Sequence, residues 1–272
     1  MSRTALHFPR LGSGFAAGCA LALICPAVVE ADERPAASVS ASAEAAQHPL
    51  EPALQIARES LEAAEAVKDF EAAFSKRDVI NGRVFAHTMT VKYRAEPFSV
   101  YMRFAEPHEG REVIYVQGEN ENKLLVHETG LIGLVGTLEI DPLSQQAMSE
   151  SRHPITNMGM KPLAEGVIKQ WENELKYGEI EVKYYPNAKV RGMECKVIES
   201  SHPQPRRQFP FQKTRLFIDK ATNLPVRVEQ YGFPTTAGQK PPLLEEYTYW
   251  NVRGNVGLTD RDFDPENPKY GY

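Results

Sequence analysis

The stretch FSVYMRFAEPHEGREVIYVQGENENKLLVHE, residues 98–128, decides the fold of this chain. Within it, apolar residues alternate with polar or small ones, as they do in a β-strand that has one buried face. Two segments rich in turn-forming residues, 107–110 and 118–122, divide the stretch into three runs. We therefore predict a three-stranded antiparallel meander, to which the rest of the chain adds strands and covering helices.

The remaining chain continues this alternation and adds two amphipathic helices. The first helix is expected at residues 53–76, where apolar residues recur at spacings of three and four. The second opens at Pro162 and repeats apolar residues every four positions, at Leu163, Val167, Trp171 and Leu175. Further strands are expected at residues 83–93, 179–185, 193–200, 213–219, 225–231 and 244–252. The fold class is therefore α+β, with mainly antiparallel strands.

Two local expectations concern the edges of this fold. Pro186-Asn187 is interpreted as the turn that ends the strand at 179–185. Phe263 is expected to pin the C-terminal tail to the sheet.

The first 31 residues have the organisation of a secretory signal peptide. Arg3 and Arg10 precede a run of small and apolar residues at 11–29, and Val29-Glu30-Ala31 fits a cleavage site. A transmembrane anchor is the weaker alternative, because the run is short and interrupted. Cys19 leaves a lipoprotein cleavage site open as well. Cleavage near Ala31 would place the mature protein in the periplasm or outside the cell.

The chain after the signal peptide divides into two parts. Residues 32–52 are rich in Ala, Ser, Glu and Pro and have no apolar period, which predicts a disordered linker. Residues 53–272 are expected to form a single domain.

Composition and motifs exclude several classes of function. The formal net charge is −5, so nucleic-acid binding is disfavoured. Signal-peptide cleavage would leave Cys195 as the remaining cysteine, which excludes an internal disulfide and favours a buried structural thiol. Motifs for nucleotide binding, zinc proteases and serine hydrolases are absent, and the histidines lie far apart in the sequence. No cofactor and no metal ion are therefore expected.

Two adjoining segments are candidates for a binding site. Residues 130–143 (GLIGLVGTLEIDPL) space three glycines through apolar residues, which suits either a rim loop over an apolar cavity or a plain buried hairpin. Residues 144–159 gather polar groups, and Arg152, His153 and Asn157 are the candidates for a polar rim. Helix capping and loop bracing are the alternative roles for these side chains.

Several motifs resemble a known fold. VYMRFAEPHEGREVIYV, NKLLVHETG, LFIDKATNLPVRVEQYG and EEYTYWNVRGNVGLTDRDF look like the periplasmic lipoprotein-carrier (LolA/LolB-like) fold, over residues 53–263. SRHPITNMG resembles more closely a secreted bacterial family known as a domain of unknown function. The resemblance implies a strongly curved sheet that forms an incomplete barrel, with the N-terminal and mid-chain helices covering or plugging its concave side.

Such a half-barrel would enclose an apolar cavity. The candidates for its lining come from the predicted strands, the glycine-containing segment and the second helix. They are Phe85, Met89, Val100, Met102, Phe104, Leu134, Ile140, Val167 and Trp171.

Three functional hypotheses follow. The first is a monomeric cell-envelope protein that binds acyl chains of a lipid or a lipoprotein in the cavity, without catalysis. The second is a structural or protein-interaction module that holds an envelope partner through a sheet edge and the loop carrying Arg206 and Arg207. The third is a hydrolase that uses His153 or His127 together with Arg152.

Overall fold

The computed structural model of this chain describes residues 47–133, 136–236 and 238–272. The predicted signal peptide and most of the predicted linker lie outside these residues. The described part contains the helices α1 (Leu50–Glu65), α2 (Gly130–Gly133) and α3 (Met160–Glu174). None of its helices is long and apolar enough to cross a membrane. Its strands are β1 (Asp69–Ile80), β2 (Arg83–Arg94), β3 (Ser99–Glu106), β4 (Glu112–Val116), β5 (Leu124–His127), β6 (Leu138–Ile140), β7 (Glu181–Val190), β8 (Met193–Ser201), β9 (Lys213–Asp219), β10 (Pro225–Tyr231) and β11 (Leu243–Gly254).

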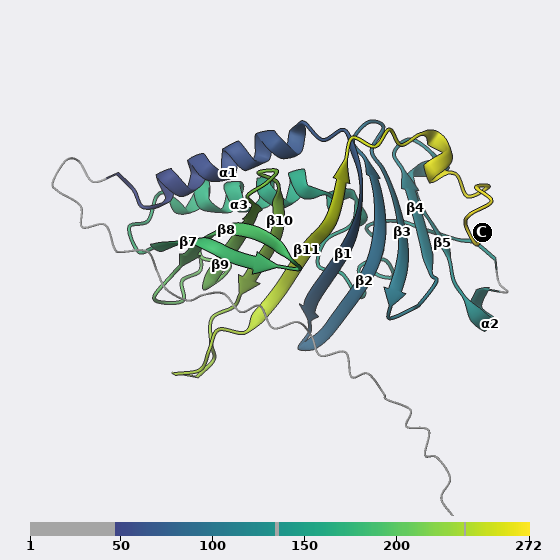
Figure 1. The fold of residues 1–272 in the computed structure, drawn as a ribbon. Helices are drawn as coiled ribbons and strands as arrows, with labels where there is room; N and C mark the ends of the chain where they lie inside the picture. The colour runs from purple at the N-terminus through teal and green to yellow at the C-terminus, as the bar shows by residue number, and fades with distance from the viewer. Residues whose placement is uncertain (1–46, 134–135, 237) are drawn as a thin grey trace, which may run out of the picture.

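The eleven strands form one antiparallel sheet in the order β6-β5-β4-β3-β2-β1-β11-β10-β9-β8-β7. Two meanders, β1 to β6 and β7 to β11, are joined where β1 pairs with β11. In the described part of the chain β6 and β7 remain as free edges, so the barrel is incomplete (Figure 1). The predicted fold class, an α+β half-barrel with two helices, is confirmed.

The meander predicted at residues 98–128 is present as β3, β4 and β5. Met102 pairs with Val113, and Val113 pairs with Val126 across the next strand. Because side chains directly opposite one another share a face, these three residues project from the same side of the sheet.

The prediction of a helix at residues 53–76 is wrong in its last part. Helix α1 ends at Glu65, and β1 begins at Asp69. Phe70 and Phe74 are four residues apart, a spacing that places side chains on one face of either a helix or a strand. The strand prevails because Asn81 and Gly82 form a two-residue turn in which both have positive φ angles, 51° and 76°. That turn closes a twelve-pair hairpin between β1 and β2.

The predicted turn at Pro186-Asn187 is also wrong. β7 continues through these residues to Val190, with a bulge between Tyr185 and Ala188. Proline lacks the N–H that a central strand needs, yet β7 is an edge strand, where a bulge accommodates it. The turn lies at Arg191-Gly192, whose φ angles are 49° and 86°.

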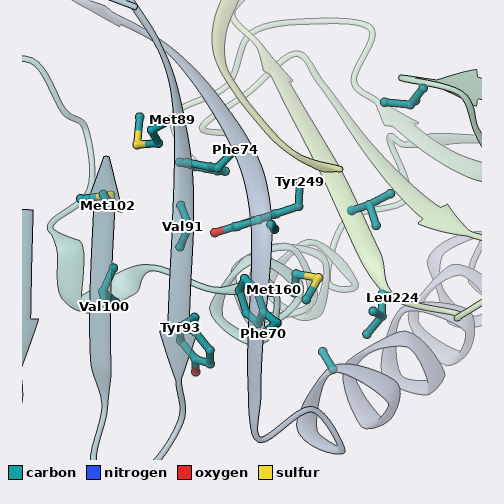
Figure 2. Close-up of a cluster of buried hydrophobic side chains, with 14 of the residues drawn as sticks. Phe70, Phe74, Met89, Val91, Tyr93, Val100, Met102, Met160, Leu224 and Tyr249 are labelled. Carbon is teal, nitrogen blue, oxygen red and sulfur yellow. The ribbon is translucent and has the colours of Figure 1, made fainter. Parts of the chain in front are cut away.

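The two faces of the sheet are covered differently. We call the face that carries Phe74, Met89 and Met102 the inner face; Figure 2 shows these side chains within a large buried apolar cluster. The outer face of β3 to β5 is covered by the C-terminal tail, where Phe263 is only 2% exposed. The predicted role of Phe263 as an anchor of the tail is thus confirmed.

Candidate ligand cavity

A cavity of about 860 Å³ lies on the inner face of the sheet. Its walls are the inner sides of β1 to β6, β10 and β11, one side of α3, and the segments 142–159 and 207–211. Most of the wall is apolar because each strand places alternate apolar residues on the inner face. Segment 142–159, which connects β6 to α3, supplies much of the remaining wall.

The structure brings five of the predicted lining residues into this cavity. Met89, Met102, Phe104, Ile140 and Val167 line it. Ile140 lies in the short edge strand β6, so the last part of segment 130–143 contributes to the cavity wall. Leu134 lies outside the described residues.

Three other candidates occupy different places among the described residues. Phe85 is half-buried in β2, with the Arg83 guanidinium 5.4 Å from its ring centre. Val100 is fully buried in the apolar cluster of β3, away from the cavity wall. Trp171 is fully buried between α3 and the sheet, where its Nε1 donates to Ser200 Oγ at 2.8 Å. Trp171 does not line the cavity because it lies on the face of α3 that packs against the sheet. Its indole points at β8 and not at the open part of the half-barrel.

The polar end of the cavity is built around a buried carboxylate, Glu245. His153 and Asn157 line the cavity as predicted rim candidates. Arg152 lies just outside it and donates from Nε to Glu245 Oε2 at 2.9 Å, while His153 Nε2 lies 3.1 Å from the same oxygen. Burial raises the pKa of Glu245, but His153 and Arg152 outweigh burial and hold that pKa below its ordinary value. The hydrogen bond to Glu245 in turn raises the pKa of His153.

A second carboxylate, Asp78, completes this arrangement. The Tyr247 hydroxyl donates to Asp78 Oδ1 at 2.5 Å, and Asp78 is 1% exposed. Lys76 Nζ lies 3.7 Å from Asp78 and donates to the main-chain oxygen of Glu150 at 2.8 Å and to the Ser151 hydroxyl. The pKa of Lys76 is lowered, because burial outweighs the attraction of these carboxylates. Segment 150–153 is therefore tied to the sheet by charged and polar contacts.

A third group of polar side chains, centred on Glu150, adjoins the groups around Glu245 and Asp78. His87 Nε2 lies 3.1 Å from Glu150 Oε2, and His108 Nε2 lies 3.7 Å from the same oxygen. Burial, with a smaller contribution from Lys76, lowers the pKa of His87. The ring of His87 is therefore uncharged near neutral pH.

Sequence reasoning missed most of this polar end. Lys76 was assigned to a helix, and Asp78, Glu150 and Glu245 carried no motif. Strand pairing brings these polar residues together, because Lys76 pairs with His87 on one side and with Tyr247 on the other. Polar residues in phase with inner apolar ones, such as Lys76 with Phe74, are the sequence feature that could have identified it.

The two histidines of the hydrolase hypothesis are separated. His153 and Arg152 meet at Glu245, but His127 lies beside the C-terminal tail, with its ring centre 5.5 Å from that of Tyr272. His127 does not contribute to the cavity wall. The described residues form a largely apolar chamber with charged groups in its wall, which suits an amphiphilic molecule.

Comparisons with known proteins gave one family match. The family model described as "Protein of unknown function (DUF1571)" matches residues 67–272. No curated protein matches the chain significantly.

Several solved structures are similar to this chain. Lipoprotein LppX from Mycobacterium tuberculosis is 16% identical with a TM-score of 0.44, and the match covers 79% of this chain and 100% of that one. The MucA/MucB complex from Pseudomonas aeruginosa gives 15% identity and a TM-score of 0.44, over 78% of this chain and 60% of that one. A LolA superfamily protein from Nitrosomonas europaea gives 14% identity and a TM-score of 0.30, over 76% and 97% of the two chains. At these identities and TM-scores, the similarities do not bear on function.

Proposed function

The chain belongs to the DUF1571 family, and we propose that it is a non-catalytic cell-envelope protein that holds an acyl chain of a lipid or a lipoprotein in its cavity. The observation that carries this proposal is the cavity of about 860 Å³, with a largely apolar wall and a charged group of Lys76, Asp78, Glu150 and Glu245. Binding sites for small molecules usually combine a chamber of this size with a few polar groups that fix orientation.

The energetics of burial are sufficient for useful affinity. Each methylene removed from water contributes about 0.8 kcal/mol, so ten methylenes contribute roughly 8 kcal/mol before the cost of ordering the chain. A free energy of that size corresponds to a dissociation constant on the order of micromolar. No catalytic group is needed for this function.

The orientation of the ligand follows from the distribution of charge. The hydrocarbon would lie against Met89, Met102 and Val126, which come from neighbouring strands of the inner face. Its polar head would lie near Lys76 and Glu245, beside this apolar wall. The predicted signal peptide at residues 1–31 supports an envelope location, where such ligands are abundant.

Displacement of a fluorescent fatty-acid probe tests this proposal. Leu163 of α3 lines the cavity, so Leu163→Glu would place a charge against the hydrocarbon and should weaken probe binding at least about tenfold. Leu143→Glu is the matched control, because Leu143 is 73% exposed and does not contribute to the cavity wall. Circular dichroism and urea unfolding establish that both variants are folded.

Two outcomes would count against the proposal. One is the absence of saturable probe binding to the folded wild-type protein. The other is an equal loss of affinity in Leu163→Glu and Leu143→Glu, which would place the probe on the surface instead of in the cavity.

An envelope protein partner is the alternative, and the β7 edge is where a strand from such a partner could pair. Tyr184 on this edge is 37% exposed. Pro186 and the following bulge interrupt the edge, so added pairing would be limited to the first half of β7. Arg206, in the loop suggested for a partner, already pairs with Glu179 at 2.5 Å. These features favour the cavity over the edge as the main binding site.

A further inference from the structure

Three potential metal ligands from distant parts of the sequence meet at the charged end of the cavity. They are His87 of β2, His108 of the turn between β3 and β4, and Glu150 of segment 142–159. One ligand atom from each lies within 4.8 Å of the other two. Side-chain exposure is 2% for His87 and 36% for both His108 and Glu150.

We propose that His87, His108 and Glu150 form a binding site for a divalent transition-metal ion of the zinc type, with an open coordination position towards the cavity. Two imidazoles and one carboxylate are a ligand set that zinc accepts when it keeps a position free for water or another ligand. Imidazole nitrogens disfavour magnesium and calcium, which take oxygen ligands.

The distances fit this coordination. Ligand atoms about 2.0 Å from a tetrahedral ion lie about 3.3 Å from one another. The Glu150 oxygen is 3.1 Å from His87 Nε2 and 3.7 Å from His108 Nε2, so small side-chain movements are enough to admit an ion. The two imidazole rings are nearly parallel, with an interplanar angle of 18° and centres 6.0 Å apart.

The surroundings favour a cation in spite of a nearby ammonium group. Lys76 donates to the main-chain oxygen of Glu150, but Asp78 lies 3.7 Å from Nζ and offsets its charge. The Glu150 carboxylate therefore remains available for the ion.

The second nitrogen of His87 limits the expected affinity. His87 Nδ1 is buried and has no hydrogen-bond partner among the described residues. Zinc-bound histidines usually donate this N–H to a carboxylate or carbonyl, and loss of that contact weakens binding about 10- to 100-fold. We therefore expect a dissociation constant on the order of micromolar, weaker than in a structural zinc site.

The open position faces a space that a ligand can enter, since His87 and Glu150 both line the cavity. An anionic group at the head of a cavity ligand could complete the coordination. This last step depends on the proposed acyl binding, whereas binding of the metal alone does not.

Titration of the purified full chain with zinc and cobalt ions tests the site. We expect one ion per chain by calorimetry and a visible absorption band from bound cobalt that zinc removes. His108→Asn should weaken binding at least about 100-fold, because it removes a ligand. It should preserve the turn, since asparagine tolerates the positive φ of 67° at this position. His87→Gln, which removes a different ligand, should have the same effect.

His48→Asn is the matched control, because His48 lies outside the cavity and bonds to the main-chain oxygen of Tyr177. Binding should be unchanged in this variant. Unchanged affinity in His108→Asn, or the absence of saturable binding to the folded wild type, would overturn the proposal. In the second case the cluster would be a hydrogen-bonded His–Glu pair. Displacement of the fluorescent fatty-acid probe is measured with and without a metal chelator. Because this measures acyl binding directly, a failure of metal binding can be distinguished from a failure of the acyl-binding proposal.

Discussion

The two halves of the sheet carry the same alternation of apolar residues, yet one half, β7 to β9, is filled and the other, β1 to β6, is hollow, with β10 and β11 between them. On the β7–β9 half, Ile198, Leu216 and Ile218 are buried beneath α1 and α3. On the β1–β6 half, Met89, Met102 and Phe104 border the cavity. Figure 1 shows both long helices over β7 to β10, whereas β3 to β5 lie beyond them.

The difference shows that the covering segment, and not the strand pattern, decides whether an inner face becomes core or cavity. A helix with apolar residues every three or four positions fills the space above a sheet with interlocking side chains. Segment 142–159 covers the other half without a long helix, and charged contacts hold its middle part at residues 150–153. Contacts of that kind fix a segment in place but leave the apolar wall beneath it exposed to a ligand.

The largest expected effect comes from opening the filled half. Trp171→Ala should lower the free energy of unfolding by about 3–5 kcal/mol, because it empties the space between α3 and β8 and leaves Ser200 without its indole partner. Urea unfolding followed by circular dichroism measures this loss. Trp171→Phe, which keeps most of the volume, should cost clearly less. A loss below about 1 kcal/mol for Trp171→Ala would mean that the helices do not hold this half together.

A matched pair of methionine substitutions compares a fully packed position with one in the cavity wall. Met160 is 2% exposed and packs away from the cavity, whereas Met102 lies in its wall. Met160→Ala should cost about 2–4 kcal/mol, since its atoms are surrounded by protein. Met102→Ala should cost roughly half as much, because one side of Met102 already faces empty space. Equal costs in urea unfolding would show that the cavity wall is packed as tightly as the surroundings of Met160.

Much of this architecture was predictable from the sequence. Alternation and turn residues at 98–128 predicted β3, β4 and β5, and the second helix was recognised from its apolar stripe at Leu163 and Val167. The errors came from local ambiguity. The spacing of Phe70 and Phe74 fits the period of a helix and that of a strand equally well. Pro186 indicates a turn unless it is known that β7 is an edge strand.

The site was less predictable than the fold. Apolar residues such as Met89 and Met102 could be assigned to a common face from their phase, so their place in the wall followed from the strand pattern. Trp171 and Val100 follow the same apolar pattern but are fully buried in the core. The phase of the apolar pattern alone does not distinguish a core position from a position in the cavity wall. The cluster of His87, His108 and Glu150 depends on how a strand, a turn and a connecting segment meet. Residues so far apart in the chain leave no local spacing to find.

The smallest expected effect concerns the polar contacts that hold the cover of the hollow half. The pKa of His153 is raised above 6.5 by Glu245, so its contribution to stability is complete below pH 6.5 and is lost as the pH rises through the raised pKa. The pKa of Glu245 is lowered below 4.5 because His153 and Arg152 outweigh its burial, so its contribution is complete above pH 4.5 and is lost in stronger acid. The ion pair should therefore stabilise the protein most between pH 4.5 and 6.5.

His153→Asn tests this expectation. It should lower the free energy of unfolding by less than about 1 kcal/mol at pH 5.5, because His153 is half exposed and solvent screens the pair. The loss should shrink towards zero at a pH above the raised pKa of His153, where the imidazole of the wild type is also uncharged. Met102→Ala removes no titratable group, so its cost should stay the same at both pH values. A cost of His153→Asn that stays the same at both pH values would mean that packing, and not charge, holds segment 150–153 over the cavity.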